Sequence, residues 1–265
     1  MSVDFTIDGD IARITVDRDD KRNAFDADII GELTRSLDQV AQYPEVRAVV
    51  LGGAGKHFSA GADLAWMRAM ADMDHDDNIA DARRLAALMD AIDQCPRPVV
   101  VRVQGAAFGG ALGLICAADI AVASDDARFC LSEVRLGILP AVIAPYVVRA
   151  LGQRQARRFF MTAEVIPAAT AEQLSLVHKV VPRDQLDDTV DEQLNLLRGG
   201  APGAQCRARE LVERVAHGPV DESMRDYTAG LIAELRDADE GREGLSAFLE
   251  KRTPKWRASS RENES

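Results

Sequence analysis

The sequence has few of the residues that build disulfide frameworks and metal centres. Four cysteines and four histidines are spread over 265 residues, with no C-x-x-C pair and no H-x-x-x-H pair. Scattered cysteines predict reduced, mostly buried thiols, and the absence of Cys/His clusters argues against a metal site. The cysteines are Cys95, Cys116, Cys130 and Cys206.

Long apolar runs and a basic leader are also missing. No apolar run reaches the roughly 18 residues that span a membrane. The N-terminal Met1-Ser2-Val3-Asp4 is not a basic region followed by an apolar stretch, as a signal peptide would be. We therefore expect a cytoplasmic protein with no membrane partner. The 47% of hydrophobic and 28% of charged residues are typical of a globular protein.

Basic residues are outnumbered by acidic ones, 32 to 43, which gives a formal net charge of -11. Nucleic-acid binding depends on basic surface that replaces counterions, so we expect no nucleic-acid partner. A polyanionic ligand could bind only where the basic residues gather locally.

Hydrophobic periodicity predicts alternating strands and helices, followed by helices alone. Strands are expected over 3–7 and 11–16, joined by Asp8-Gly9-Asp10 as a hairpin turn. Apolar residues at helical spacing predict helices over 26–42 and 77–95. Further strands are expected at 47–51, 98–103, 119–123, 127–131 and 178–181. Helices are expected at 145–151, 153–162 and 169–176, then at 184–198, 203–216, 220–236 and 239–250.

This order predicts an α/β fold. The expected divisions are an α/β core over 1–197, a helical region over 198–256 and a flexible tail over 257–265.

Two Gly-containing turns each follow a strand and open a helix, at Gly61-Ala62-Asp63-Leu64 and at Gly109-Gly110-Ala111. The first N–H groups of a helix lack internal partners and lie at its positive end. Two such turns facing each other would stabilise an oxyanion. On the residues alone, two tight connections explain the pattern better than an oxyanion site does. Neither a Walker loop nor G-x-G-x-x-G is present.

Five segments resemble the enoyl-CoA hydratase/isomerase (crotonase) family and cover nearly the whole chain. HFSAGADL (57–64) and QGAAFGGA (104–111) are similar to its two signature segments. ADIAVA (118–123), FCLSEVRLG (129–137) and EGLSAFLEKR (243–252) follow in the family's order.

The resemblance implies a crotonase-like spiral of ββα turns with a helical C-terminal oligomerisation region. It implies an acyl-CoA substrate and no cofactor beyond the CoA of that thioester. A homotrimer or a dimer of trimers is the implied assembly. The Ala62 and Gly110 amides would form the oxyanion hole for the thioester carbonyl.

A typical hydratase of this family uses two glutamates, and this sequence retains one. Alignment from Gly109-Gly110 puts Gly113 at the first glutamate position and Glu133 at the second. Glu133 is thus the expected acid/base, with a pKa raised in an apolar pocket. Gly113 is expected to make room for a bulkier or charged acyl group.

The segments SAGADLAWM (59–67) and LPAVIAPY (139–146), together with Gly113, are most similar to the methylglutaconyl-CoA hydratase-type branch. That resemblance implies a branched or carboxylated enoyl-CoA, similar to 3-methylglutaconyl-CoA. Two alternatives stay open. An enoyl-CoA isomerase would need Glu133 alone, and a protein of another class would be a non-catalytic CoA-binding scaffold.

The resemblance implies CoA-binding residues in three parts of the chain. Lys21-Arg22-Asn23-Ala24 is similar to a family segment that lines the CoA. Phe248 and Lys251 match positions that reach a neighbouring subunit's CoA. The expected CoA-binding residues are Lys21, Arg22, Ala24, Ala60, Ala62, Asp63, Leu64, Phe248 and Lys251.

Overall fold

The computed structural model describes residues 2–258, apart from the side chains of His217 and Ala258. The chain divides into two units, Met1–Gln193 and Leu194–Ser265. None of the helices within the described range is long and apolar enough to cross a bilayer.

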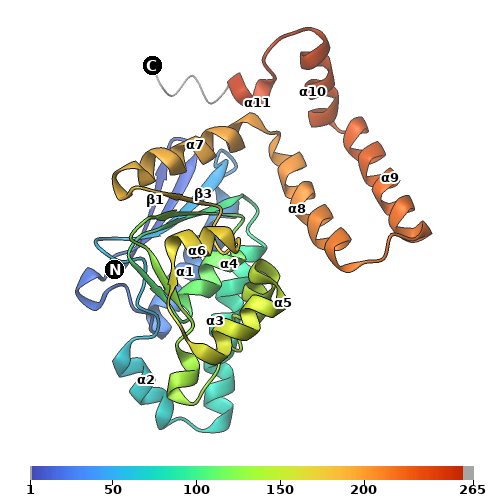
Figure 1. Cartoon of the computed structure of the whole chain (residues 1–265). Coiled ribbons are helices and arrows are strands. Elements are labelled where there is room, and N and C mark those ends of the chain that lie inside the picture. The colour runs from blue at the N-terminus through green and yellow to red at the C-terminus, as the bar shows by residue number, and fades with distance from the viewer. Residues whose placement is uncertain (1, 259–265) are drawn as a thin grey trace. The chain divides into compact units, whose positions relative to one another are not determined.

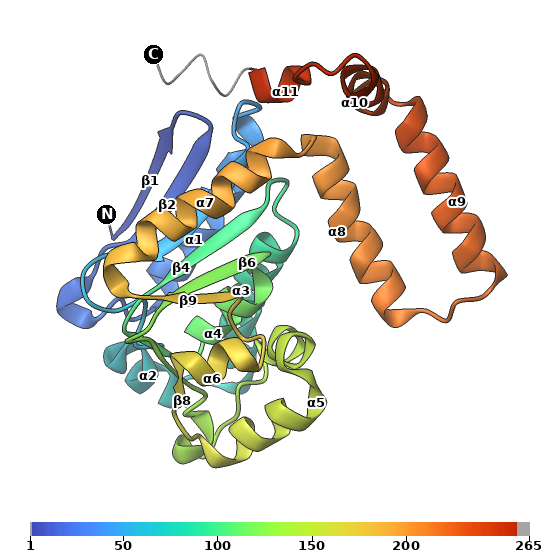
Figure 2. The ribbon, with the colours of Figure 1, turned by 45° about the horizontal axis from the view of Figure 1, so that its top comes forward.

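The first unit contains a six-stranded sheet with the order β1-β2-β3-β4-β6-β9 (Figure 2). The hairpin β1–β2 is antiparallel and every other neighbouring pair is parallel. All six residues of β3 are buried, as expected for a parallel strand covered on both faces. The strands are β1 (Val3–Asp8), β2 (Ile11–Val16), β3 (Ala48–Gly53), β4 (Val99–Val103), β6 (Ile120–Ser124) and β9 (Lys179–Val181).

A second sheet of three short strands, in the order β5-β7-β8, supports the functional turns. Its members are β5 (Ala106–Phe108), β7 (Arg128–Cys130) and β8 (Ile166–Pro167). β5 leads directly into Gly109-Gly110, and β7 is separated from Glu133 by only two residues. The parallel pairing of β5 with β7 therefore brings the second Gly turn and Glu133 together.

The helices of the first unit pack against one another in the order α1, α3, α4, α5 (Figure 1). All seven residues of α4 are buried, which explains its small side chains. The helices are α1 (Ala27–Gln39), α2 (Leu64–Ala71), α3 (His75–Asp93), α4 (Ala111–Ala117), α5 (Ala144–Thr162) and α6 (Ala168–Gln173). Four 3₁₀ turns are η1 (Asp19–Lys21), η2 (Val40–Gln42), η3 (Glu133–Leu136) and η4 (Arg183–Gln185).

The α/β fold expected from the sequence is confirmed, and so are the helices that end the chain. These are α7 (Leu186–Gly199), α8 (Pro202–His217), α9 (Glu222–Asp237), α10 (Asp239–Leu249) and a short α11 (Lys255–Ala258). The division at 197/198 and the oligomerisation role of the second part stay predictions. Residues 257 and 258 of the expected tail belong to α11, and 259–265 lie outside the described residues.

Single residues set two features of the helices. Helix α3 begins at His75, two residues before the start expected at 77, because the Asp74 side chain accepts from the Asp77 N–H and caps the helix. The two helices expected at 145–151 and 153–162 are both present within α5, and Gly152, with a non-helical φ of 72°, separates them at a kink. Glycine adopts this left-handed conformation without steric cost.

Candidate active site

The first turn directs the Ala62 N–H away from the neighbouring chain segment. Phe25 donates its N–H to the Gly61 carbonyl at 2.7 Å, and Asp63 donates its N–H to the Phe25 carbonyl at 2.6 Å. In this bridge the intervening Ala62 N–H points to the opposite side. No acceptor within residues 2–258 bonds to it.

The second turn presents the Gly110 N–H in a similar way. Gly109, at a φ of 55°, donates its N–H to the Cys130 carbonyl at 2.8 Å, which ties the turn to β7. Gly110 caps α4, so its own N–H has no helical partner, and the described part of the chain supplies no other acceptor.

Close contact between the turns requires glycine. The Phe108 N–H donates to the Ser59 carbonyl at 3.0 Å, and a Cβ at Gly61 would lie 2.8 Å from the Phe108 carbonyl oxygen. A side chain at Gly61 would therefore separate the two turns.

Both turns open onto one cavity of about 330 Å³. Ala62, Gly110 and Glu133 line it together, from three different parts of the chain. Most of the remaining wall is apolar and comes from Phe25, which precedes α1, from α2 and α3, and from the segment before α5 that includes Ile143. The arrangement can therefore hold an apolar chain beside two free N–H donors and the Glu133 carboxylate, with a second carboxylate, Asp81, elsewhere in the wall.

One carboxylate oxygen of Glu133 is available for acid/base chemistry. Its Oε2 is buried and has no hydrogen-bond partner in the structure. Burial raises the pKa of Glu133 above its usual value of 4.5, because the charged form loses hydration. A Cβ at Gly109 would lie 3.3 Å from Glu133 Oε1, so a side chain at that position would crowd the carboxylate.

The expectation that Gly113 leaves room for a larger acyl group is wrong. A Cβ at Gly113 would lie 2.3 Å from Ile143 Cγ2 and 2.7 Å from Met89 Sδ. The space is therefore already filled by Ile143, from the segment before α5, and by Met89, from α3. A glutamate cannot occupy this position unless these neighbours move.

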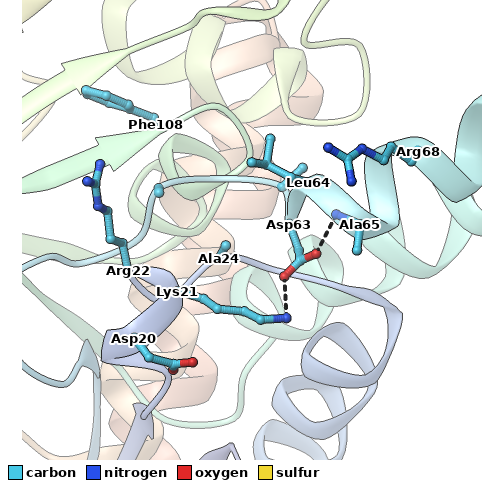
Figure 3. A pocket seen from close by; sticks show the side chains of 11 residues that line it. Asp20, Lys21, Arg22, Ala24, Asp63, Leu64, Ala65, Arg68 and Phe108 are labelled. Carbon is cyan, nitrogen blue, oxygen red and sulfur yellow. Dashed lines mark hydrogen bonds and ion pairs between the residues drawn. The ribbon is translucent and has the colours of Figure 1, made fainter.

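A second cavity, of about 750 Å³, adjoins the first at Ala62 (Figure 3). Three cationic side chains, Lys21, Arg22 and Arg68, line it together with two carboxylates, Asp20 and Asp63. This is a local excess of positive charge on a protein with a net charge of -11. The other expected CoA residues that line it are Ala24, Ala60, Ala62 and Leu64.

Asp63 links the first turn to the cationic segment. Its Oδ2 accepts a hydrogen bond from Lys21 Nζ at 3.0 Å and lies 3.4 Å from Arg18, while its Oδ1 caps α2 at the Ala65 and Trp66 N–H groups (Figure 3). The Lys21 hydrogen bond, aided by the two helix N–H groups, lowers the pKa of Asp63 against the effect of burial. The carboxylate thus holds both the turn and Lys21 in place.

We expect Asp63→Ala to destabilise the protein. Loss of the helix cap alone costs about 0.5–2 kcal/mol of the free energy of unfolding. Because the folded-state pKa of Asp63 is lowered, its charge contributes stability above the usual Asp pKa of 3.8, and this is lost as the pH falls through the folded value. Urea unfolding should show a difference from wild type that shrinks on acidification. The control Asp63→Asn keeps a capping side chain and should be milder; equal stability of wild type and Asp63→Ala would contradict this role.

Two expected CoA residues belong to the second unit. Phe248 is 81% exposed near the end of α10, and Lys251 follows that helix with a φ of 54°. Their role at a neighbouring subunit's CoA stays a prediction.

The cavity residues that the predicted site left out include Trp66, Arg68 and Asp81. For Asp81 the helical periodicity was a usable signal, because this aspartate occupies a position on the face of α3 whose other buried residues are apolar.

Comparison with known proteins decides the family. A sequence model described as enoyl-CoA hydratase/isomerase matches residues 6–259. The chain belongs to the enoyl-CoA hydratase/isomerase (crotonase) family. It is therefore an enzyme of the crotonase family, as the resemblance implied.

A crystal structure of an enoyl-CoA hydratase from Shewanella pealeana is 45% identical, with a TM-score of 0.94, over 97% of this chain and 96% of that one. The short-chain-enoyl-CoA hydratase of Clostridium acetobutylicum is 30% identical over 92% of this chain and 93% of its own. The trans-2-decenoyl-[acyl-carrier-protein] isomerase of Streptococcus mutans is 28% identical over 95% and 96%. Both hydratases and isomerases thus occur among the relatives of this crotonase-family chain.

Crotonase-family hydratases generally need no cofactor beyond the CoA of their substrate. Within residues 2–258, no group of three or more His, Cys, Asp and Glu side chains could hold a metal ion.

Proposed function

We propose that this crotonase-family enzyme is an enoyl-CoA hydratase that uses Glu133 as its sole acid/base. The observation that carries the proposal is the buried Glu133 Oε2, which has no hydrogen-bond partner among residues 2–258 and belongs to the same cavity as the free N–H groups of Ala62 and Gly110. Two N–H donors in the wall of one cavity suit a thioester oxygen that gains negative charge.

In the proposed reaction, the thioester carbonyl oxygen accepts hydrogen bonds from the Ala62 and Gly110 N–H groups. Glu133 takes a proton from water as the water oxygen bonds to the β-carbon, and the electrons of the double bond move to give an enolate. The protonated Glu133 then delivers its proton to the α-carbon. One water is added and Glu133 returns to its starting state. The raised pKa of Glu133 suits a group that must both take and give a proton.

We propose that the larger cavity holds the polar part of CoA. Two observations support this proposal. Three cationic residues, Lys21, Arg22 and Arg68, line the larger cavity, and this cavity adjoins the acyl cavity at Ala62. Arg and Lys are suited to phosphate groups by charge and by their hydrogen-bond donors.

Of the branched and carboxylated acyl groups expected from the sequence, we favour an uncharged, branched one. No Lys or Arg is among the residues that line the acyl cavity, whereas Asp81 and Glu133 are. A carboxylated chain such as that of 3-methylglutaconyl-CoA would meet like charge there without a partner.

Double-bond isomerisation is the second candidate function. The lone carboxylate supports it, because one base can remove a proton and return it to another carbon. An isomerase is also named among the relatives.

A substrate panel separates these functions. Purified protein would be offered crotonyl-CoA, 3-methylcrotonyl-CoA, 3-methylglutaconyl-CoA and a 3-enoyl-CoA, with products identified by mass spectrometry. We expect water addition, fastest with an uncharged branched substrate. Migration of the double bond without hydration would replace the proposal with isomerase. CoA-ester binding without any turnover would favour the non-catalytic scaffold.

We further propose a homotrimer or dimer of trimers in the cytoplasm. Exposed apolar residues of the C-terminal helices support an assembly surface: Ile232, Leu245, Phe248 and Leu249. None of the four cysteines forms a disulfide in the described part of the chain, which agrees with a reducing compartment.

A further inference from the structure

Asp81 is a charged residue in an apolar position. The other buried residues of α3 are Leu88, Met89 and Ile92, so Asp81 occupies the first position of the inward face of this helix. It is only 5% exposed. Its one partner in the structure is the exposed Arg84, whose Nη1 lies 3.3 Å from Oδ1. A buried carboxylate with so little compensation is destabilising for the fold, which points to a role in the cavity that it lines.

Trp66 supplies a second unsatisfied polar group in the same cavity. Its Nε1–H is buried and has no hydrogen-bond partner among residues 2–258, although buried indole N–H groups normally have one. Trp66 comes from α2 and Asp81 from α3, and both line the acyl cavity. Apart from Glu133 and Asn78, the other side chains of that cavity are apolar. The Asn78 amide group already donates to the Met73 and Asp74 carbonyls.

Asp81 does not replace the glutamate absent at position 113. The α3 residue beside Gly113 is Met89, eight positions after Asp81. At 1.5 Å of rise per residue, this places Asp81 about 12 Å farther along the helix. An aspartate side chain cannot cover that distance, so Asp81 faces a different part of the acyl group from the one that a carboxylate at 113 would reach.

We propose that Asp81 and Trp66 form a subsite for a hydroxyl group on the distal part of the acyl chain. A hydroxyl can donate to the Asp81 carboxylate and accept from the Trp66 Nε1–H at once. A ketone could only accept, an ammonium group could only donate, and a carboxylate would be repelled by Asp81. Placing the subsite on the acyl chain rests on the proposed function.

The test compares 2-enoyl-CoAs of increasing chain length, each with and without a terminal hydroxyl. For wild type we expect kcat/KM to favour the hydroxylated substrate at least ~10-fold at the best chain length, below the ~10⁴-fold reached by sites built around a substrate hydroxyl. Asp81→Leu should reverse this preference. Trp66→Phe removes the N–H donor together with part of the aromatic wall of the cavity, so it should slow both substrates but the hydroxylated one more, which lowers the hydroxyl-to-alkyl ratio of kcat/KM. The control Asp90→Leu changes an exposed aspartate of the same helix and should leave the ratio unchanged.

Equal kcat/KM for the two substrates with wild type at every length would overturn the subsite, and so would variants that slow both substrates equally. Calorimetric binding of the matched saturated acyl-CoAs distinguishes failure of the subsite proposal from failure of the hydratase proposal. Tighter binding of the hydroxylated ester, lost in Asp81→Leu, would support the subsite even if no substrate is turned over. Hydration without any hydroxyl preference would overturn the subsite and leave the hydratase proposal standing.

Discussion

Glu133→Gln is expected to lower kcat for hydration by about 10²–10⁴-fold or more, the usual contribution of a general acid or base. Glutamine has nearly the same shape but cannot take a proton from water and return it to the α-carbon. Binding of a CoA ester should be largely preserved, since the cationic residues Lys21, Arg22 and Arg68 are untouched. Steady-state kinetics with calorimetric binding would check both expectations. In wild type, the rate should fall on acidification through a pKa above the usual 4.5 of glutamate.

The same variant should be more stable than wild type at neutral pH. Burial raises the pKa of Glu133 in the folded state. At a pH between the usual pKa of glutamate and this raised pKa, the unfolded state has released the proton that the folded state still holds. The free energy of unfolding of wild type therefore falls as the pH rises through this range, whereas the uncharged glutamine is not affected. Thermal unfolding should show a gain at neutral pH that vanishes near pH 4.5. The control Glu45→Gln, at an exposed position, should change neither activity nor stability. Near-wild-type hydration by Glu133→Gln would remove Glu133 from the mechanism.

Gly113→Ala is expected to destabilise the protein by about 1–3 kcal/mol, the usual cost of overpacking. Alanine normally stabilises a helix relative to glycine by about 1 kcal/mol, but here its Cβ would lie 2.3 Å from Ile143 Cγ2. Gly113→Glu, which restores the family's first carboxylate, should be worse because it also buries a charge. Urea unfolding would measure both effects.

The matched control is Gly230→Ala, within α9, where an added Cβ meets nothing within 4 Å. That change should stabilise the protein. Pairing Gly113→Glu with Ile143→Ala should recover part of the lost stability, because the smaller residue vacates the space. If Gly113→Ala proved as stable as wild type, the filled space at Gly113 would not explain the absent glutamate.

The two turns and Glu133 could be anticipated from the sequence because their positions depend on short segments. Gly61-Ala62 and Gly109-Gly110 each sit between a strand and a helix, and Glu133 follows β7 by two residues. Once β5 pairs with β7, these local features meet at one cavity.

The shape of the acyl cavity could not be anticipated, because it depends on contacts between distant segments. Ile143 and Met89 fill the place at Gly113 from two other elements, so a missing side chain did not mean an empty space. Asp81 and Trp66 likewise become neighbours of the cavity only when α2 and α3 fold over it.

The central claim is that Glu133 alone carries a proton from water to the α-carbon of a thioester held by Ala62 and Gly110. The most direct test is to let wild type and Glu133→Gln act on 3-methylcrotonyl-CoA in D₂O and analyse the products by NMR. The account predicts a β-hydroxyacyl-CoA with one deuterium at the α-carbon from wild type, and almost none from the variant. Hydration and deuterium incorporation at wild-type rates by Glu133→Gln would contradict it.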